Sequence, residues 1–326
     1  MWNVLLFFVL SVSSKLVSSD LSSSNTQTEI PQAPKTKLNV LLANDDGWAE
    51  ADIRALYQVL KEDGKFPIIS APTHDRSATG GARKKVKDLD EPAEYHSAPA
   101  GAPGYGCDPE DEHVCYVNGN PIDAIEYGVR NLSQLYFGGP PDLALTGPNL
   151  GANIGPQAEF SGTYNAAEWA ALHDIPAIAL SVFKEHHRHG YRKLKPSDAS
   201  YIYAKVVLRL VNALTSVDKQ KPYLPLGLLL NVNIQKAGPK RKCKAPEDYK
   251  FVLTSQYGHS DWKFWKSHRD LKRCGDEVLP SEYHIMDQKH GCWASITVRM
   301  ADDDKRANKV EQQQVVDLLG DLLTCP

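Results

Sequence analysis

The sequence predicts an α/β protein: a parallel β-sheet with helices on both faces, followed by an antiparallel extension and a terminal helix. Two observations predict the sheet. Between residues 38 and 232, short apolar runs alternate with segments whose apolar residues have helical spacing, the usual order of a parallel sheet. The runs are continuously apolar, as expected of strands buried on both faces. After Asn233, turn residues, aromatics and charges dominate, which predicts the extension.

The first strand–helix–strand unit is the clearest. Leu38–Leu42 is a short apolar run, and the helical pattern at 52–63 ends before Gly64, a residue typical of helix C-termini. The same criteria predict further strands at 66–71, 143–146, 177–182, 226–232 and 293–300. They predict further helices at 121–129, 163–173, 197–214 and 309–323.

The two ends of the chain differ in character. Residues 1–19 join an apolar run at Val4–Leu10 to small residues at Val17–Ser19, which is typical of a signal peptide cleaved near Asp20. Residues 20–36 are rich in Ser, Thr, Gln and Pro and are interpreted as a flexible leader. We therefore expect a secreted protein with one domain at 37–326, in which the charged, Pro- and Gly-rich segment 83–118 is a surface insertion.

Net charge and cysteine content limit the class of protein. A formal net charge of -3 gives no reason to expect stable nucleic-acid binding or a membrane-bound protein. The six cysteines include no C-x-x-C pair, so a zinc ribbon is not indicated, and an even number in an exported chain predicts disulfides. Their pairing is open, with Cys107–Cys115 the most plausible local loop. Asn131-Leu132-Ser133 is a glycosylation sequon, which predicts a glycoprotein.

Three polar clusters follow predicted strands. They are Asn44–Gly47 after the first strand, His74–Gly81 after the second, and the stretch from Gly147 through Asn149 and Asn153 to Thr163. In open α/β sheets, ligands bind beyond the carboxyl ends of the strands. We therefore expect these clusters to meet at one edge of the sheet and to form the functional site.

The adjacent aspartates Asp45 and Asp46 predict a divalent cation. Two neighbouring carboxylates repel each other, and a cation offsets that repulsion directly. Oxygen ligands favour Mg²⁺, Mn²⁺ or Ca²⁺ over zinc or copper. A serine hydroxyl from the second cluster and an asparagine carbonyl from the third would complete the ligand set. A lone Asp-Asp-Gly is more often a turn before a helix, so the prediction depends on all three clusters converging.

The third cluster ends in Ser161-Gly162-Thr163, which opens the predicted Ala-rich helix at 163–173. Free backbone N–H groups at a helix start, together with hydroxyl groups, can hold a phosphate group. An ordinary Ser or Thr N-cap is the alternative, and it is common.

These motifs, in this order and spacing, resemble the SurE family of phosphatases and nucleotidases. The resemblance is carried by Asn44-Asp45-Asp46-Gly47, by Asp75-Arg76-Ser77, by Gly147-x-Asn149-x-Gly151-x-Asn153-x-Gly155, and by Ser161-Gly162-Thr163 before an Ala-rich helix. Weaker similarities lie at Asn231-Val232-Asn233, at 254–258 and at 291–297. Together they span residues 38 to about 300.

The resemblance implies a Rossmann-like fold, a homodimer formed by exchange of C-terminal elements, and a metal-dependent phosphomonoesterase. Its substrates would be phosphate monoesters such as nucleoside 5′- and 3′-monophosphates, and a broad acid phosphatase is the related expectation. The implied metal ligands are Asp45, Asp46, Ser77 and Asn149. The residues implied to line the phosphate site are Asn153, Ser161, Gly162 and Thr163.

Asp45 and Asp46 are the catalytic candidates. Asp45 would orient or deprotonate a metal-activated water, or it would form an aspartyl-phosphate, and the sequence leaves both roles open. The competing class is a secreted, non-catalytic ligand-binding protein on the same scaffold. A dinucleotide-binding oxidoreductase is not indicated, because no G-x-G-x-x-G follows the first strand.

Overall fold

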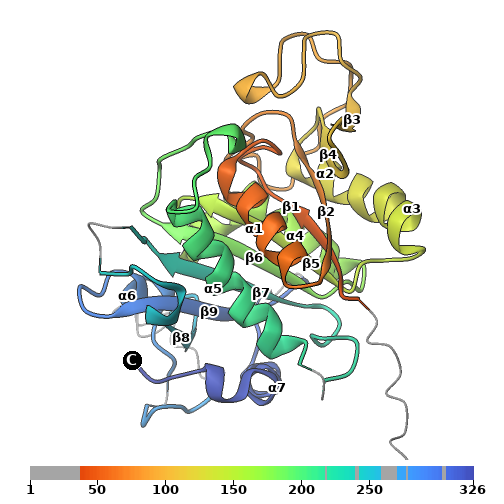
Figure 1. The fold of residues 1–326 in the computed structure, drawn as a ribbon. Coiled ribbons are helices and arrows are strands. Elements are labelled where there is room, and N and C mark those ends of the chain that lie inside the picture. Colours follow the sequence, from red (N-terminus) through yellow and green to blue (C-terminus); the bar gives the residue numbers. More distant parts are fainter. Residues whose placement is uncertain (1–36, 217–218, 239–241, 258–269, 277, 303–305) are drawn as a thin grey trace, which may run out of the picture. The chain divides into compact units, whose positions relative to one another are not determined.

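The computed structural model describes residues 37–326, apart from 217–218, 239–241, 258–269, 277 and 303–305. Within this part of the chain, nine strands form one sheet in the order β3-β4-β2-β1-β5-β6-β7-β9-β8 (Figure 1). The strands are β1 (Asn39–Ala43), β2 (Phe66–Pro72), β3 (Tyr105–Asp108), β4 (Asp111–Val117), β5 (Leu143–Leu150), β6 (Ala177–Phe183), β7 (Leu228–Gln235), β8 (Tyr249–Thr254) and β9 (Cys292–Met300).

Helices cover both faces of this sheet. One face carries α1 (Ala51–Glu62), α5 (Ala199–Leu214) and α7 (Lys309–Leu319), and the other carries α2 (Pro121–Tyr127), α3 (Ser133–Phe137) and α4 (Gly162–Leu172). The short α6 (Glu282–Met286) packs against β9. No helix among the described residues is long and apolar enough to cross a membrane.

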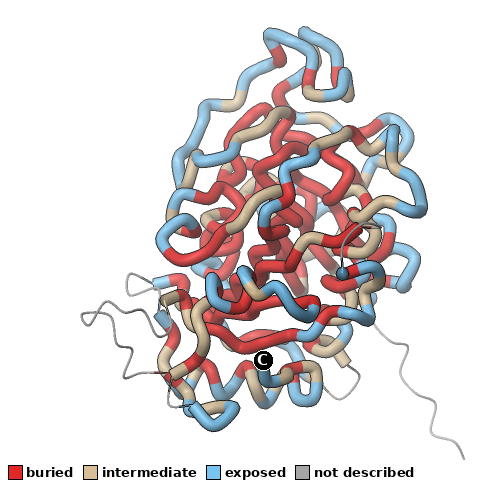
Figure 2. The backbone as a smooth tube through the Cα atoms, turned by 90° about the vertical axis from the view of Figure 1, so that its left-hand side faces the viewer, coloured by how far each residue is buried: buried red, intermediate tan, exposed pale blue. Residues whose placement is uncertain are grey.

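The central strands are buried on both sides, as their continuous apolar sequences predict (Figure 2). In β1, Val40 and Leu42 pack into the core beneath α1 and α5, while Leu41 and Ala43 pack into the core beneath α2 and α4. This alternation follows from the two-residue period of a strand. The predicted α/β fold with a covered parallel sheet is therefore confirmed.

The chain reverses direction across the sheet between β1 and β5. β1 pairs in parallel with β2 on one side and with β5 on the other. From β1 the chain proceeds outward to β2 and β4, whereas β5, β6 and β7 follow one another in the opposite direction. Such a switch point creates a crevice at the carboxyl ends of the strands, where open α/β sheets bind ligands.

Strand β5 runs further into this crevice than the predicted 143–146. Its register with β6 shifts between Thr146 and Asn149, so that Asn149 pairs with Ser181. The shift passes through Gly147, whose φ is +110° and where an added Cβ would lie 2.2 Å from the Leu180 carbonyl oxygen. Only glycine fits this position, and it allows the strand to continue to Leu150.

The segment 83–118 is only partly a surface insertion. Its last part forms β3 and β4, and β4 joins the sheet in parallel with β2, with Ile69 opposite Val114. The sequence pattern does not indicate β4, because only its last four residues, Val114–Val117, are buried. Its first residues are polar, and Asp111 accepts hydrogen bonds from Tyr57 and Lys61 of α1.

The C-terminal extension is half antiparallel. β9 pairs antiparallel with β7, as predicted, but β8 was not predicted and lies parallel to β9. The helix predicted at 121–129 continues through a π-helical turn at Gly128–Leu132 into α3. The other elements agree with their predicted bounds to within about four residues, the usual uncertainty of element ends.

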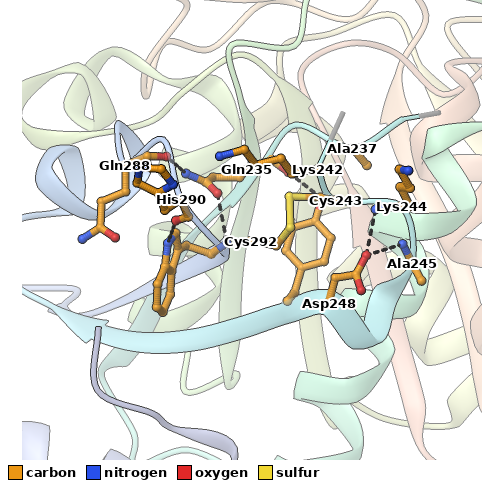
Figure 3. The surroundings of a disulfide bond; sticks show 12 residues. Gln235, Ala237, Lys242, Cys243, Lys244, Ala245, Asp248, Gln288, His290 and Cys292 are labelled. Carbon is orange, nitrogen blue, oxygen red and sulfur yellow. Dashed lines mark hydrogen bonds between the residues drawn. A yellow bond between two sulfur atoms is a disulfide. The ribbon is translucent and has the colours of Figure 1, made fainter. Parts of the chain in front are cut away.

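All six cysteines are paired, as Cys107–Cys115, Cys243–Cys292 and Cys274–Cys325. The first pair is the predicted local loop and joins β3 to β4. Cys292 opens β9 beside Gln235, whose side chain accepts a hydrogen bond from Trp293 N (Figure 3). Near Cys325, Thr324 N donates to the Phe251 carbonyl of β8 (2.8 Å).

Candidate active site

The Asp45–Asp46 turn lies directly beyond the end of β1, at the switch point of the sheet. Asn44 closes the turn, because its side chain donates to Gly47 O (3.0 Å) and accepts from Gly47 N (3.1 Å). Arg76 N donates to Asp45 O (2.7 Å), which joins this turn to the loop after β2. Both aspartates are buried, each with 2% of its surface exposed.

Asp45 is directed at the first turn of α4. Thr163 donates twice to its carboxylate, from the backbone N to Oδ2 (3.1 Å) and from the hydroxyl to Oδ1 (2.5 Å). The helix start favours a negative charge there, since its N–H groups and dipole are positive. Gly162 packs against this carboxylate so closely that an added Cβ would lie 3.0 Å from the Asp45 Cβ. Ser161 caps the helix by accepting from Tyr164 N (3.1 Å).

Asp46 points toward β5 and Arg188. Its Oδ2 accepts from Leu150 N (2.9 Å), and its Oδ1 lies 3.9 Å from the Arg188 Nε. Burial raises the pKa of Asp46 well above its usual range, and the neighbouring Asp45 charge adds to that effect. Burial also raises the pKa of Asp45, although the two Thr163 hydrogen bonds oppose the shift. A positive charge at this place would therefore be strongly stabilising.

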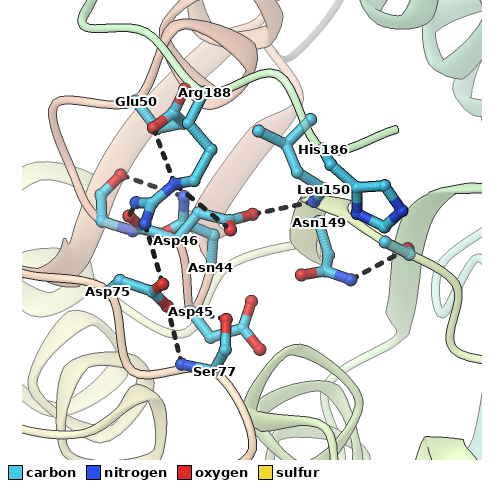
Figure 4. Close-up of polar contacts among 12 residues, drawn as sticks. Asn44, Asp45, Asp46, Glu50, Asp75, Ser77, Asn149, Leu150, His186 and Arg188 are labelled. Atoms are coloured by element: carbon cyan, nitrogen blue, oxygen red, sulfur yellow. Dashed lines mark hydrogen bonds and ion pairs between the residues drawn. The ribbon is translucent and has the colours of Figure 1, made fainter. Parts of the chain in front are cut away.

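The loop after β2 brings Ser77 to the same region (Figure 4). Asp75 holds Ser77, because its Oδ1 accepts from both the Ser77 backbone N (2.8 Å) and the Ser77 hydroxyl (2.6 Å). The other Asp75 oxygen pairs with Arg188 Nη1 (2.8 Å). Ser77 is exposed, unlike the aspartates.

Arg188 lies in the segment after β6 and contacts four acidic residues. Besides Asp75, it pairs with Glu94 (2.9 Å) and lies 3.4 Å from Glu50 and 3.9 Å from Asp46. It also donates to the Asp46 carbonyl oxygen. Glu50 is fully buried and accepts from Tyr95 OH and His189 N. The acidic residues around the site thus outnumber this arginine.

Asn149 faces the aspartates from β5. Its side-chain nitrogen donates to Gly151 O (3.0 Å), and in Figure 4 its side-chain oxygen points toward Asp45 and Asp46. An amide oxygen in this orientation is available as a cation ligand.

Residues 149–155 continue as a loop, here named the asparagine loop, which is anchored by buried amides. Asn153 N donates to Asn233 Oδ1 (3.0 Å), and Asn153 O accepts from the side chains of Asn231 (2.8 Å) and Asn233 (3.0 Å). The Asn153 side chain donates to Ser181 Oγ (2.8 Å). At the far end, Gly155 N donates to the fully buried Glu282 (2.8 Å).

The structure gathers most of the predicted site residues but gives some of them unexpected contacts. Asp45 and Asp46 from the turn after β1, Ser77 from the loop after β2 and Asn149 from the end of β5 meet at the same sheet edge. The Thr163 donors contact Asp45, Ser161 caps α4, and the Asn153 amide contacts Ser181.

Sequence reasoning missed Arg188, Glu50 and Glu282. Arg188 follows the end of β6, so the same strand-end criterion that selected the aspartates would have selected it. Glu282 lies on a short helix 127 residues beyond its partner Gly155, and no local pattern links the two.

The donor set fits a hard divalent cation. Two adjacent carboxylates, a serine hydroxyl and an amide oxygen are all oxygen ligands, which Mg²⁺ and Mn²⁺ prefer. No three His, Cys, Asp or Glu side chains of the described residues are grouped to hold a metal ion. A cation here would therefore depend on one or two carboxylates together with neutral oxygens and water, which is the usual environment of Mg²⁺.

The fold and the site together define a Rossmann-like α/β protein with an acidic, oxygen-rich site at its switch point. Comparison with known proteins identifies its relatives. The chain belongs to the SurE family: residues 40–262 match the family described as survival protein SurE.

Two relatives found by sequence and one solved structure of the same fold accompany this match. An acid phosphatase of Yarrowia lipolytica is 33% identical over 313 residues, which cover 88% of this chain and 86% of that protein. A 5′-nucleotidase SurE of Synechococcus sp. is 32% identical over 202 residues, covering 62% of this chain and 67% of that protein. The crystal structure of SurE from Aquifex aeolicus has a TM-score of 0.54 and 22% identity, covering 81% of this chain and 94% of that one.

Proposed function

We propose that this protein is a divalent-metal-dependent phosphomonoesterase that hydrolyses small phosphate monoesters, with nucleoside 5′- or 3′-monophosphates as the first candidates. The observation that carries the proposal is the buried Asp45–Asp46 pair, held at the switch point by a helix start, by β5 and by Arg188. The relatives named acid phosphatase and 5′-nucleotidase support it, because both act on phosphate monoesters.

Asp45, Asp46, Ser77 and Asn149 would hold the cation, which we propose to be Mg²⁺ or Mn²⁺, with Ca²⁺ as a further candidate. A bound divalent cation polarises phosphoryl oxygens and lowers the pKa of water. Asp46 is fixed by Leu150 N, so its carboxylate keeps one orientation toward the crevice.

The protein's own side chains and backbone would orient the reacting groups. Thr163 donates to both Asp45 oxygens, which fixes the orientation of this carboxylate. Asp45 would then either orient the attacking water or attack phosphorus itself, forming an aspartyl-phosphate as the ester P–O bond breaks and the alcohol leaves. The start of α4 carries a positive dipole, which would favour a phosphoryl group placed near it. Asn153, Ser161, Gly162 and Thr163 are the proposed lining of that phosphate site.

We also propose that the protein is secreted and glycosylated at Asn131, after loss of a signal peptide at 1–19 and with 20–36 as a leader. Asn131 is exposed on the π-helical turn between α2 and α3, where a glycan would meet solvent. Three disulfides are consistent with an oxidising compartment. A homodimer completes the proposal, and the solution mass from light scattering checks it.

The deciding experiment measures phosphate release from nucleoside monophosphates and an aryl phosphate by the purified, disulfide-intact protein. EDTA should abolish release, and added Mn²⁺ or Mg²⁺ should restore it. Asp46→Ala should reduce kcat by at least about 1,000-fold, because it removes a metal ligand at the reacting centre. Asp317→Ala, which changes an exposed aspartate of α7, is the matched control and should leave kcat unchanged.

No release with any of these cations, from protein whose circular dichroism shows it folded, would contradict the proposal. The non-catalytic binding protein would then be the better description.

A further inference from the structure

Arg188 touches two of the three segments that carry the proposed metal ligands, the loop after β1 and the loop after β2. It donates to the Asp46 carbonyl oxygen and pairs with Asp75 Oδ2 (2.8 Å). It also pairs with Glu94 Oε2 (2.9 Å). A planar guanidinium holds several oxygens at fixed angles, which an ammonium group does not. We propose that Arg188 is a positioning residue that sets the geometry of the metal site, an inference that rests on the proposed function.

The orientation of Arg188 is fixed by Glu50, which lies on the side of the guanidinium facing away from the two loops. Its Nε lies 3.4 Å from Glu50, whose side chain is fully buried. Glu50 is fixed in turn, because it accepts from His189 N (2.8 Å) and from Tyr95 OH (2.7 Å). The arginine therefore has little freedom to turn away from the two loops, although 27% of its side chain is exposed.

Through Asp75, Arg188 also restrains the position of Ser77. One Asp75 oxygen binds Arg188, and the other accepts from both the Ser77 backbone N and the Ser77 hydroxyl. The position of the Ser77 hydroxyl oxygen therefore depends on a carboxylate that Arg188 holds. On the other loop, the Asp46 backbone is held directly. Arg188 thus sets the spacing between a carboxylate ligand and the hydroxyl ligand.

A simple counter-charge would have the opposite effect on a cation. Arg188 Nε lies 3.9 Å from Asp46 Oδ1, so its positive charge repels a cation at Asp46. Removing that charge would then tighten metal binding. Removing a positioning residue would weaken metal binding despite the lost repulsion. The sign of the change in affinity separates the two roles.

The test measures Mn²⁺ affinity by titration calorimetry, without substrate, for the wild type, Arg188→Lys and Arg188→Met. Positioning predicts that both variants bind Mn²⁺ about 10- to 100-fold more weakly, the range typical of residues that orient metal ligands. A counter-charge predicts unchanged binding for Arg188→Lys and tighter binding for Arg188→Met, and that result would overturn the inference. Arg192→Met is the matched control on the same segment and should bind as the wild type does.

A second readout does not require the metal. Amide hydrogen exchange at Ser77 should accelerate at least about 10-fold in both Arg188 variants, since the Asp75 acceptor loses its anchor. Unchanged exchange at Ser77 would overturn the inference even if the metal affinity fell. If the wild type bound no Mn²⁺, the proposed function would fail, and the exchange at Ser77 would still decide the role of Arg188. Thermal unfolding confirms that each variant is folded.

Discussion

The two sides of the site are held by different chemistry. On the side of Asp45 and Asp46, the contacts are charged: Arg188 binds the Asp46 backbone, Asp75 and Glu94, with Glu50 behind it. On the side of the asparagine loop, they are largely neutral, with the side-chain amides of Asn231 and Asn233 bound to the Asn153 backbone, although Glu282 accepts from Gly155 N and Asp46 from Leu150 N.

The difference separates two requirements of the proposed reaction. Charged contacts respond to protons, to salt and to a bound cation, so this side can adjust when a metal ion or substrate arrives. Neutral amides in a buried environment keep one geometry over a wide pH range. We therefore expect substitutions on the amide side to affect stability and turnover together, and substitutions on the charged side to act through pH and metal.

Among substitutions that compare the two sides, we expect Asn233→Leu, on the amide side, to have the largest combined effect on stability and turnover. This change leaves Asn153 N buried without an acceptor and removes one donor to Asn153 O. An orphaned buried N–H costs about 1–3 kcal/mol and a lost hydrogen bond about 1 kcal/mol, so unfolding free energy should fall by about 2–4 kcal/mol. Turnover should fall about 10- to 100-fold because the loop loses its position. Urea unfolding and kcat check both.

Gln134→Leu is the control for this prediction, because Gln134 is exposed on α3 and lies outside the asparagine loop. It should change the unfolding free energy by less than about 0.5 kcal/mol. If Asn233→Leu were equally mild, the rigid amide side would be refuted.

On the charged side, we expect the stability of the protein to depend on pH through Asp52, on the first turn of α1. Burial, with a smaller contribution from the charge of Glu50, raises the pKa of Asp52 to about 7 from its ordinary value of 3.8. The folded state therefore binds more protons than the unfolded state between these values, so this group lowers stability as pH rises through that window.

Asp52→Asn should remove this loss. It should stabilise the protein by about 2–4 kcal/mol at pH 8, and by much less at pH 4, where the aspartate is protonated in the folded state. Denaturant unfolding at both values measures the difference. An equal effect at the two pH values would show that charge is not what makes Asp52 unfavourable.

The smallest effect is expected for Tyr95→Phe. The Tyr95 hydroxyl donates to Glu50 (2.7 Å), behind Arg188, and Glu50 keeps its bond from His189 N when the hydroxyl is lost. Unfolding free energy should fall by about 0.5–1.5 kcal/mol, the usual value of one hydrogen bond, with kcat changed less than about threefold. A loss of turnover as large as that of Asn233→Leu would show that the charged side is as rigid as the amide side.

The parts of this structure that sequence predicts are those where local pattern and topology agree. The order of strands and helices follows from their apolar periodicity, and the meeting of Asp45, Asp46 and Asn149 follows from the rule that strand ends share an edge. The weaker similarities in the second half of the chain prove informative, because Asn231 and Asn233 anchor the asparagine loop.

The parts that sequence does not predict depend on distant partners. β4 begins with polar residues whose charges are paired by α1, so its pattern does not look like that of a strand. The residues that Arg188 contacts precede it by between 94 and 142 positions in the sequence. Thr163 donates to Asp45, 118 residues earlier, and no local pattern links the two. Only the folded arrangement pairs these groups.

The contact of Thr324 with β8 has a consequence for how copies of this protein behave at high concentration. β8 is the last strand of the sheet, and an open strand is a template for pairing with a second molecule. Leu323 and Thr324 lie along that open side at Phe251, and the Cys274–Cys325 bond holds them there. The disulfide therefore helps to prevent edge-to-edge aggregation. Reducing it would expose the unpaired edge of β8, which could then pair with a strand of a second molecule.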